Sequence, residues 1–391
     1  MNKDSWEIKT MGEIGFIITG NTPKTSISQN YDSKDINFVK PSDILNNEIT
    51  FLDSSESYIS EFARDKARIL PIGSVLVTCI GIIGKIAITN KEVAINQQIN
   101  AIVPSNNILS EFLAYSLLNA KDTLNRIANA PVVPIINKTQ FSALTISVPS
   151  ITIQEQIVKE LDTLSDIITK KKEQLAELDK LAQATFYDMF GDPVENEKGW
   201  DIRGLEKICT QIVDCPHSTP IKSETKTLYP CIRTSELKNG SINWDSMQYV
   251  EQEEYLKRTK RLTPKAGDII YGREGSYGDA VCLPNTGHNF CLGQRTMLFR
   301  PNSQILNSTY LLKFIISDYV YSQARNKNAG STVGHVNVSD IKKFNILCPP
   351  LSLQNQFAEK IEAIEQQKEL INQSITNVQL LFDYTMDKYF N

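Results

Sequence analysis

The chain has 391 residues, of which 41% are hydrophobic and 22% charged, an ordinary composition for a soluble protein with room for several domains. Its net charge of −4 argues against a simple nucleic-acid binder, whose surface is normally basic, so any DNA site has to be a local patch. The longest uncharged apolar stretch, residues 69–84, is too short for a membrane helix, and the opening MNKDSWEIK has no apolar signal core. We therefore expect a cytoplasmic protein with no membrane partner.

The two halves of the sequence repeat one another, each running from a β-rich segment into a long helical segment. Four landmarks recur 194 residues later: Trp6, Gly73, Gly81 and Gly84 correspond to Trp200, Gly267, Gly275 and Gly278. The offset rises to 200 at the tracts PSITIQEQI, from Pro149, and PPLSLQNQF, from Pro349, as two small insertions in the second copy would produce. Two copies of one unit predict a pseudo-twofold axis.

Residues 1–150 are expected to form the first β-rich domain. Short β-branched and aromatic runs between turn residues, such as INFVK and GSVLVTCIG, predict strands. The Gly-x-x-Gly loop GIIG at 81–84 lacks the spacing of a phosphate-binding P-loop, so we expect a tight turn or bulge there. The irregular loop NAPVVPIINK at 129–138 is a candidate for recognition, because loops on a rigid scaffold often carry it.

Residues 151–190 are predicted to be a long helix, because Ile153 to Phe190 contains no Gly or Pro. Apolar residues recur in steps of four and three, the pattern of a coiled coil. The stripe consists of Ile157, Leu161, Leu164, Ile168, Leu175 and Leu178. A helix of about 38 residues spans about 57 Å, so it could act as a ruler.

Residues 191–350 repeat the β-rich pattern, with GSYG at 275–278 and the loop NAGSTVGHVN at 328–337. The two copies agree in apolar and turn residues but differ in polar ones. The matched pairs that differ are Gln98 and Arg295, Pro131 and Ser331, Lys85 and Asp279, and Lys24 and Ser218. Two domains that read different targets would show this, although ordinary drift after duplication would look similar.

Residues 351–391 are predicted to be a second long helix with the same stripe, 200 residues on. Its members are Phe357, Ile361, Ile364, Ile371, Ile375, Val378 and Phe382. Each stripe has one lysine near mid-helix, Lys171 and Lys368. A pseudo-twofold axis perpendicular to two rods makes them antiparallel, so we expect the helices to pack on each other with these lysines reaching outward. The alternative is two unrelated helices, each lying on its own domain.

Seven cysteines at irregular spacing suit a reducing compartment better than a disulfide framework, so we expect free thiols. Cys209, Cys215, His217 and Cys231 together suggest zinc, but their spacing fits no standard site, and no metal is assigned.

The order of features along the whole chain resembles the DNA sequence-specificity subunit of Type I restriction-modification systems: a β-rich domain, then a Pro-x-x-x-x-Gln-x-Gln tract opening a long helix, present twice. The resemblance implies an α+β protein with two target-recognition domains related by duplication, each followed by a long helix, the two helices pairing as an antiparallel coiled coil. It implies that each domain reads one half of a split sequence in double-stranded DNA.

The resemblance also implies partners. The helices would dock methyltransferase (modification) subunits, two of them in our expectation, which bind S-adenosylmethionine and supply the chemistry. Endonuclease and translocase (restriction) subunits would join the larger complex. This chain would bind no cofactor and carry no catalytic residue.

The sequence contains no recognisable catalytic set. An amino-methyltransferase needs an Asn/Asp-Pro-Pro-aromatic tract, and the only Pro-Pro, in CPPL at 348–351, lacks both flanks. His288 and His335 have no recognisable partner nucleophile. Two alternatives stay open: a coiled-coil adaptor with two β-rich protein-binding domains and no DNA affinity, and an enzyme with a pseudo-dimeric active site between the repeats.

Specific DNA reading needs Arg, Lys, Asn or Gln at base edges, while other cations and hydroxyls hold phosphates. In the first domain the candidates are Thr22, Lys24, Lys40, Lys85, Gln97, Gln98 and Lys138. In the second they are His217, Ser218, Lys222, Arg233, Arg273, Tyr277, Gln294, Arg295, Ser331, Thr332 and His335. Taken singly, each residue is more often a solvated surface residue or one that makes a turn hydrogen bond. Arg273 and Arg295 are preferred, because the recurrent Gly loop and the recurrent Gln tract could meet there.

Overall fold

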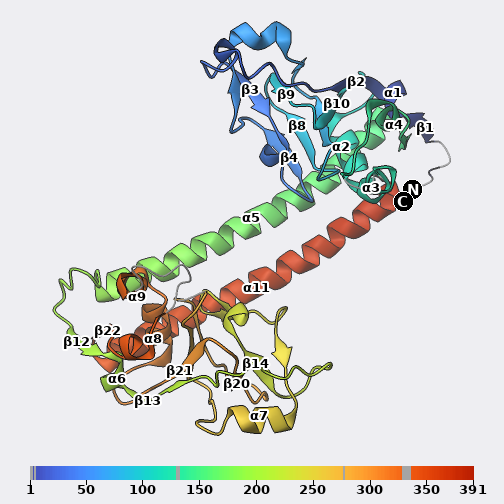
Figure 1. Ribbon diagram of the computed structural model, residues 1–391. Coiled ribbons are helices and arrows are strands. Elements are labelled where there is room, and N and C mark those ends of the chain that lie inside the picture. The colour runs from blue at the N-terminus through green and yellow to red at the C-terminus, as the bar shows by residue number, and fades with distance from the viewer. Residues whose placement is uncertain (1–2, 4–5, 129–132, 276–277, 328–335) are drawn as a thin grey trace. The chain divides into compact units, whose positions relative to one another are not determined.

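The computed structural model describes residues 3, 6–128, 133–275, 278–327 and 336–391 (Figure 1). The chain divides into two compact units. The first consists of Met1–Lys172 and Gln373–Asn391, and the second of Glu173–Asn372. Each unit therefore combines one β-rich domain with one half of each long helix, whereas the sequence-based division into four segments follows chain order.

The first unit contains two sheets and a two-stranded ribbon. The five-stranded sheet has the order β2-β10-β7-β8-β4 and the four-stranded sheet the order β5-β3-β9-β6. The strands are β1 Glu7–Thr10, β2 Gly15–Thr19, β3 Ile36–Val39, β4 Ile49–Leu52, β5 Tyr58–Ile59, β6 Ile69–Leu70, β7 Val75–Thr78, β8 Ile86–Thr89, β9 Val93–Ile95, β10 Ile99–Pro104 and β11 Thr145–Val148. Antiparallel pairing of β1 with β11 joins the first strand of the domain to the last.

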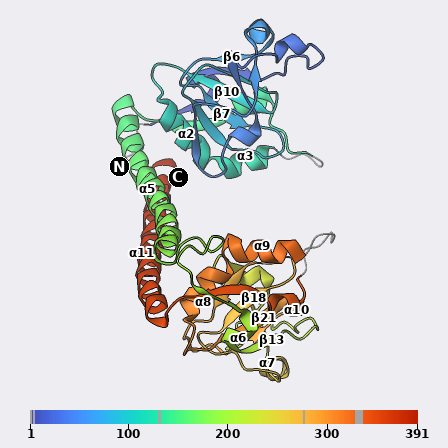
Figure 2. The same ribbon diagram turned by 90° about the vertical axis from the view of Figure 1, so that its left-hand side faces the viewer.

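The strand β7 of the first unit shows why the sequence of this domain contains continuous apolar runs. Val75 and Val77 belong to the cluster that includes Phe112 and Ile157, while Leu76 between them belongs to a separate cluster on the other face. Alternate side chains point to opposite faces of a sheet, so a strand buried on both faces needs apolar residues throughout. The short helices are α1 Met11–Ile14, η1 Ser28–Asn30, η2 Pro41–Asp43, η3 Glu61–Lys66, α2 Ser110–Asn119, α3 Lys121–Ile127 and α4 Lys138–Ser142. Figure 2 labels α2 and α3 beside the strands β7 and β10 of this unit.

The second unit has a four-stranded sheet of order β13-β21-β18-β19, a three-stranded sheet β17-β14-β20 and two ribbons, β12-β22 and β15-β16. The strands are β12 Asp201–Gly204, β13 Cys209–Asp214, β14 Pro230–Ile232, β15 Leu237–Lys238, β16 Ser241–Ile242, β17 Gln248–Tyr249, β18 Ile269–Gly272, β19 Ala280–Cys282, β20 Cys291–Leu292, β21 Thr296–Pro301 and β22 Asn345–Cys348. The short helices are α6 Leu205–Ile208, η4 Thr234–Glu236, α7 Gln252–Arg258, α8 Ser308–Ile315, α9 Asp318–Lys327 and α10 Val338–Ile341.

The duplication predicted from the sequence is confirmed at the level of strand register. In the first unit Ile99 of β10 is opposite Thr78 of β7, and in the second Thr296 of β21 is opposite Gly272 of β18. The two pairs occupy matched places in the repeat. The Gly-x-x-Gly loops match as well: Gly81, Gly84, Gly275 and Gly278 all have positive φ, which is the backbone conformation of a tight turn that favours glycine.

The first glutamine of each Pro-x-x-x-x-Gln-x-Gln tract is fully buried and ties the long helix to the domain before it. In the first unit Gln154 Oε1 accepts the backbone N–H of Leu109, next to the start of α2, and Nε2 donates to the carbonyls of Asn107 and Pro149. In the second unit Gln354 makes the matching three bonds, to Asn307 N–H and to the carbonyls of Ile305 and Pro349. The second glutamine of each tract, Gln156 or Gln356, is exposed.

The two long helices are α5, Ile151–Phe190, and α11, Leu351–Phe390. Within the first unit the start of α5 lies beside the end of α11, where Tyr389 Oη donates to Glu160 Oε2 at 2.7 Å. Within the second unit the end of α5 lies beside the start of α11, where the Phe190 and Phe357 rings are 5.2 Å apart. The paired helices are therefore antiparallel in both units, as predicted. All thirteen residues assigned to the stripes are buried or half-buried.

The expectation that both stripe lysines reach outward is wrong for Lys368. Its Nζ lies 2.8 Å from Asp179 Oδ1 on α5 and 3.1 Å from Glu365 Oε2 on its own helix. Lys368 therefore bridges the two helices within the second unit. Lys171 is half-buried.

All seven cysteines are free thiols. Across the part of the chain that the structure describes, no helix is long and apolar enough to cross a membrane.

Candidate nucleic-acid interface

Three loops of the first unit meet beside the end of β7. The N–H of Cys79 donates to the carbonyl of Gln98 at 2.8 Å, and the N–H of Ile136 donates to the carbonyl of Cys79 at 2.9 Å. Gln97 accepts a bond from Thr22 Oγ1 in the loop after β2, at 2.6 Å. The loops of this domain are thus held together by two backbone bonds and one side-chain bond.

The second unit repeats this junction with different side chains. The N–H of Arg273 donates to the carbonyl of Arg295 at 2.9 Å, and the N–H of Val336 donates to the carbonyl of Arg273 at 3.0 Å. Gln294 Nε2 donates to the carbonyl of His217 at 3.0 Å. The Gly loop and the Gln tract therefore do come together at Arg273 and Arg295.

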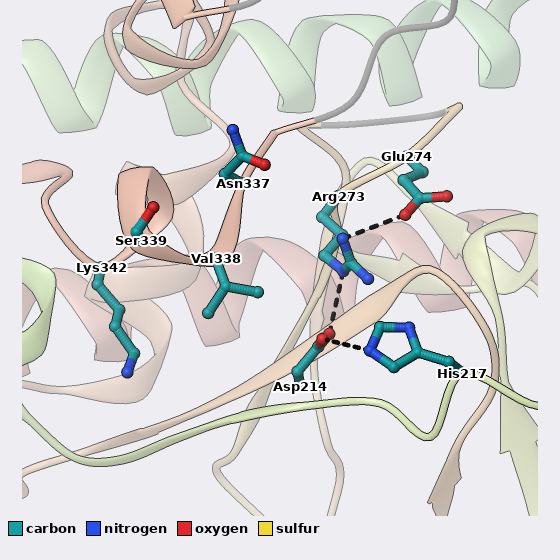
Figure 3. Close-up of a pocket in the computed structure, with 8 residues that line it drawn as sticks. All are labelled: Asp214, His217, Arg273, Glu274, Asn337, Val338, Ser339 and Lys342. Carbon is teal, nitrogen blue, oxygen red and sulfur yellow. Dashed lines mark hydrogen bonds and ion pairs between the residues drawn. The ribbon is translucent and has the colours of Figure 1, made fainter.

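A series of ion pairs runs through this junction of the second unit, and Figure 3 shows its first four members: His217, Asp214, Arg273 and Glu274. His217 Nε2 lies 3.3 Å from Asp214 Oδ2, and the other oxygen of Asp214 is 3.0 Å from Arg273 Nε. Arg273 Nη1 is 3.1 Å from Glu274 Oε1, and Glu274 Oε2 is 3.4 Å from Arg295 Nε. Two carboxylates therefore lie between three groups that are or can become cationic.

Burial separates the roles of the two arginines. The Arg273 side chain is only 5% exposed, and a buried guanidinium is stable only when carboxylates partner it. The Arg295 side chain is 60% exposed and has one ion pair at its Nε. Arg273 would have to leave Asp214 and Glu274 to reach a base, whereas Arg295 already lies at the surface. The structure therefore favours Arg295 as the contact residue and Arg273 as its support.

The matched place in the first unit carries no such charge. Cys79 corresponds to Arg273, and burial raises the pKa of its thiol to about 11, against the opposing effect of hydrogen bonds from Asn100. The thiol is therefore neutral at physiological pH. The series of ion pairs from His217 to Arg295 therefore belongs to the second copy, within a backbone framework that the two copies share.

A cavity of about 690 Å³ lies beside this series of ion pairs and separates it from the segment around α10 (Figure 3). Its lining comprises Asp214, His217, Arg273, Glu274, Asn337, Val338, Ser339 and Lys342. Of these residues, only His217 and Arg273 were predicted from the sequence as site residues. Asp214 and Glu274 were missed because a carboxylate gives no sequence signal for DNA contact. Lys342 was missed because it follows directly after α10, and a four-residue helix is too short to show a periodic pattern.

The remaining candidates of the first unit fall into two groups. Lys40 and Lys85 are half-buried and hold loops together: Lys40 Nζ donates to Ser57 Oγ, and Lys85 Nζ donates to the carbonyls of Pro41 and Ile44. The exposed candidates are Thr22, Lys24, Gln97 and Lys138, and Gln98 is half-buried. The exposed group remains available to a ligand.

The remaining candidates of the second unit also divide. Arg233 Nη2 lies 2.5 Å from Glu236, whose side chain is fully buried, so this arginine fastens a turn. Ser218 and Lys222 are exposed, and the Ser218 carbonyl accepts a bond from buried Arg258. The other four candidates of this unit lie outside the described residues: Tyr277, Ser331, Thr332 and His335.

One of the matched pairs that differ, Lys85 and Asp279, has a local explanation. Burial raises the pKa of Asp279, and a hydrogen bond from the Asn239 backbone opposes this rise. Asp279 is thus bonded to the backbone of its own domain, as Lys85 is. This pair favours drift, with each side chain serving its own loops.

The residues once considered for zinc do not form a site. Cys215 and Cys231 are buried while His217 is exposed, and burial raises the pKa of Cys209 to about 12 and also that of Cys215. Over the described ranges, no group of three or more His, Cys, Asp or Glu side chains is arranged to hold a metal ion.

A family model described as Type I restriction modification DNA specificity domain matches the chain twice, over residues 3–180 and 197–380. The chain is 27% identical over 387 residues to the specificity subunit of the Type I restriction enzyme MjaIX of Methanocaldococcus jannaschii, covering 92% of this chain and 86% of that one. It is 32% identical over 176 residues to the HindI specificity subunit of Haemophilus influenzae, covering 43% of this chain and 38% of that one.

Two solved structures share the fold. The crystal structure of the Type I restriction-modification S subunit from M. genitalium aligns with a TM-score of 0.59 and 11% identity, covering 100% of this chain and 98% of that chain. A structure from work on complex assembly and conformational transition of the Type I R-M system aligns with a TM-score of 0.59 and 16% identity, covering 99% and 98%.

Proposed function

Because this chain belongs to the Type I restriction modification DNA specificity family, we propose that it is the non-catalytic specificity subunit of such a complex. Each β-rich domain reads one half of a bipartite site in double-stranded DNA, and the two long helices set the spacing between the halves. The observation that carries this proposal is the matched loop junction of the two domains, in which one backbone arrangement presents different polar side chains. A shared framework with different contact residues suits two half-sites of different sequence.

The chemistry belongs to partners in this proposal. Two methyltransferase subunits bind S-adenosylmethionine and dock on the helices, and endonuclease and translocase subunits join the larger complex. Exposed apolar residues that lie within one turn of α11 support docking, because proteins rarely leave such clusters uncovered: Leu380, Leu381 and Tyr384 are 63%, 51% and 67% exposed. Leu181 of α5 and Leu381 of α11 occupy matched places in the repeat, and each is 51% exposed. Two equivalent apolar positions suit two copies of one partner.

The test is to sequence the methylated bases of cells that express this chain with its methyltransferase subunits, against cells that lack it. We expect a new methylated motif of two short blocks around a fixed non-specific gap. An assembled complex that methylates no such motif would contradict the proposal.

The adaptor alternative predicts no affinity for DNA, and membership of the family counts against it. A titration of the assembled complex with duplex DNA at several salt concentrations separates the two. Protein contacts with phosphates release counterions, so the logarithm of the binding constant of a DNA-binding protein falls linearly with the logarithm of the salt concentration. An adaptor would give no salt-dependent binding.

A further inference from the structure

The residue immediately before β10 in the first unit and before β21 in the second occupies one matched place with two different side chains. Gln98 occupies this place in the first copy and Arg295 in the second. Both carbonyls accept a backbone bond from the residue two positions before the Gly-x-x-Gly loop, Cys79 or Arg273. We propose that this is a base-reading position in each domain, with Gln98 reading an adenine and Arg295 a guanine. This inference rests on the proposed function and names side chains that determine specificity.

The neighbouring residue is the same in both copies and is fixed in a similar way. Gln97 accepts a hydrogen bond from Thr22 in the loop after β2, and Gln294 donates one to the carbonyl of His217 in the loop after β13. The common glutamine therefore secures the loop to its neighbour. The position that follows it is held in place while its side chain is free to differ, as a specificity position requires.

The backbone at Arg295 indicates that its side chain is used. Its φ is +66°, a conformation that non-glycine residues rarely adopt and that stores strain. Glycine would relieve this strain, and the same loop does use glycine at Gly293, where an added Cβ would lie 2.2 Å from Arg233 Cγ. Residues with strained backbones cluster at functional sites.

Glu274 positions the Arg295 side chain. One of its oxygens is 3.4 Å from Arg295 Nε, and the other is 3.1 Å from Nη1 of buried Arg273, which Asp214 anchors in turn. Because Glu274 pairs with Nε of Arg295, the Nη1 and Nη2 atoms of Arg295 are left as the two donors that match the O6 and N7 acceptors of guanine. An exposed arginine on a buried, ion-paired support loses less side-chain entropy on binding than an unsupported one.

Gln98 has a comparable partner in the first unit. Asn96 Nδ2 donates to Gln98 Oε1 at 3.0 Å, and the Asn96 side chain also accepts the backbone N–H of Gln98. A glutamine amide presents one donor and one acceptor, the pattern that pairs with N7 and the N6 amino group of adenine. The two copies thus hold the two side chains that most commonly read adenine and guanine, each beside a positioning residue.

The experiment exchanges the two side chains in the full complex with its methyltransferase subunits. Arg295→Gln and Gln98→Arg are each expressed in cells, and the methylated motif is read by sequencing. We expect each variant to change one base of one block, in different blocks, and methylation of the original motif to fall about 10- to 100-fold. Arg261→Gln is the matched control, since Arg261 is an exposed arginine in the same domain, and its motif should stay unchanged.

Two further variants separate reading from simple charge. Arg295→Lys keeps the positive charge but loses the pair of donors, so discrimination at the guanine should fall while the salt dependence of binding is kept. Glu274→Gln should weaken discrimination at that same base and leave the others unchanged, which a role in folding alone would not produce. If Arg295→Gln abolishes methylation, the purified complex is tested for binding to four duplexes that differ only at that base. Loss of the guanine preference, whether to equal affinities or to another base, supports the inference, and a retained guanine preference overturns it.

Unchanged specificity in Arg295→Gln, or changes in the same block from both exchange variants, would also overturn the inference. Failure of the proposed function has a different signature. In that case the wild-type complex itself would produce no bipartite motif.

Discussion

At the scale of single residues, the Pro-x-x-x-x-Gln-x-Gln tract contains two glutamines with different roles. Gln154 is fully buried and makes three hydrogen bonds to backbone groups of its own domain. Gln156 is exposed and reaches only Glu160, one turn further along the helix. The two glutamines are equivalent in the sequence pattern, and their roles differ because one is buried and the other is exposed.

Replacing Gln154 with Ala should destabilise the chain by about 2–3 kcal/mol, because one N–H and two carbonyls lose their partner in a buried place. The matched change Gln156→Ala should alter the unfolding free energy by less than about 0.5 kcal/mol. Urea unfolding followed by circular dichroism measures both. Equal losses of unfolding free energy in the two variants would show that the three buried hydrogen bonds of Gln154 add no stability of their own.

At the scale of elements, an aromatic cluster fastens the paired helices to the second domain. Phe357 of α11 is fully buried and lies 5.7 Å from the Phe186 ring and 5.2 Å from the Phe190 ring of α5. Tyr310 of α8 stands 4.8 Å from Phe190, so the cluster joins three helices of this unit. Edge-on contacts dominate it, as the quadrupoles of aromatic rings favour.

The change Phe357→Ala should cost about 3–5 kcal/mol, since it removes buried surface and leaves a cavity among rings that cannot close it. Leu370→Ala on the same helix is the control, because Leu370 is 65% exposed and its loss should cost less than about 0.5 kcal/mol. Melting temperatures of the purified variants test the contrast. A small loss in Phe357→Ala would indicate that the cluster repacks.

The end of α11 should make the stability of the first unit sensitive to acid. A hydrogen bond from Tyr389 lowers the pKa of Glu160 below its ordinary 4.5, helped by Gln156 and Lys388 and opposed by burial. A carboxyl with a depressed folded-state pKa contributes stability above its unfolded pKa and loses it as the pH falls through the folded one. This contribution is therefore present at neutral pH and lost below pH 4.5.

Tyr389→Phe removes that donor, so it should lower the melting temperature at pH 7 and lower it less as the pH falls below 4.5. Tyr384→Phe serves as the control, because Tyr384 is exposed on the same helix. Melting curves across this pH range give both differences. A Tyr389→Phe deficit that does not change with pH would exclude the carboxyl as its cause.

At the scale of the whole molecule, the proposed function makes the helices a spacer as well as a scaffold. Both α5 and α11 have 40 residues, with stripes that match at an offset of 200. A helix rises 1.5 Å per residue, so removing seven residues shortens it by about 10 Å and keeps the stripe in phase. A change in helix length should therefore alter the gap between the two blocks without altering the bases that each domain recognises.

Deleting residues 169–175 and 369–375 together should change the gap between the two blocks of the methylated motif or abolish methylation, while the blocks themselves stay the same. The methylated motif of the variant complex is the readout, and its circular dichroism confirms that the helices persist. A variant that folds, methylates DNA and keeps the original gap would refute the spacer role.

The sequence by itself determined the duplication, the α+β class, the two long helices and their antiparallel pairing. The elements follow from local rules, since periodicity and turn residues are properties of neighbouring residues. The duplication is visible because matched residues recur 194 to 200 positions apart, and the antiparallel pairing follows from the pseudo-twofold axis that a duplication implies. The family resemblance rested on the same order of features. The polar candidates were predicted only as a set of loop residues, because a loop sequence does not state what its side chains contact.

Only the tertiary structure decided which polar residues hold the fold and which face outward. Arg273 and Arg295 look alike in the sequence, yet one is buried between two carboxylates and the other is exposed on a strained backbone. Lys368 seemed a surface lysine, yet it bridges two helices through Asp179. Such roles depend on groups far apart in the chain that folding brings within a few ångströms, and on burial, which sets the cost of leaving a charge unpaired.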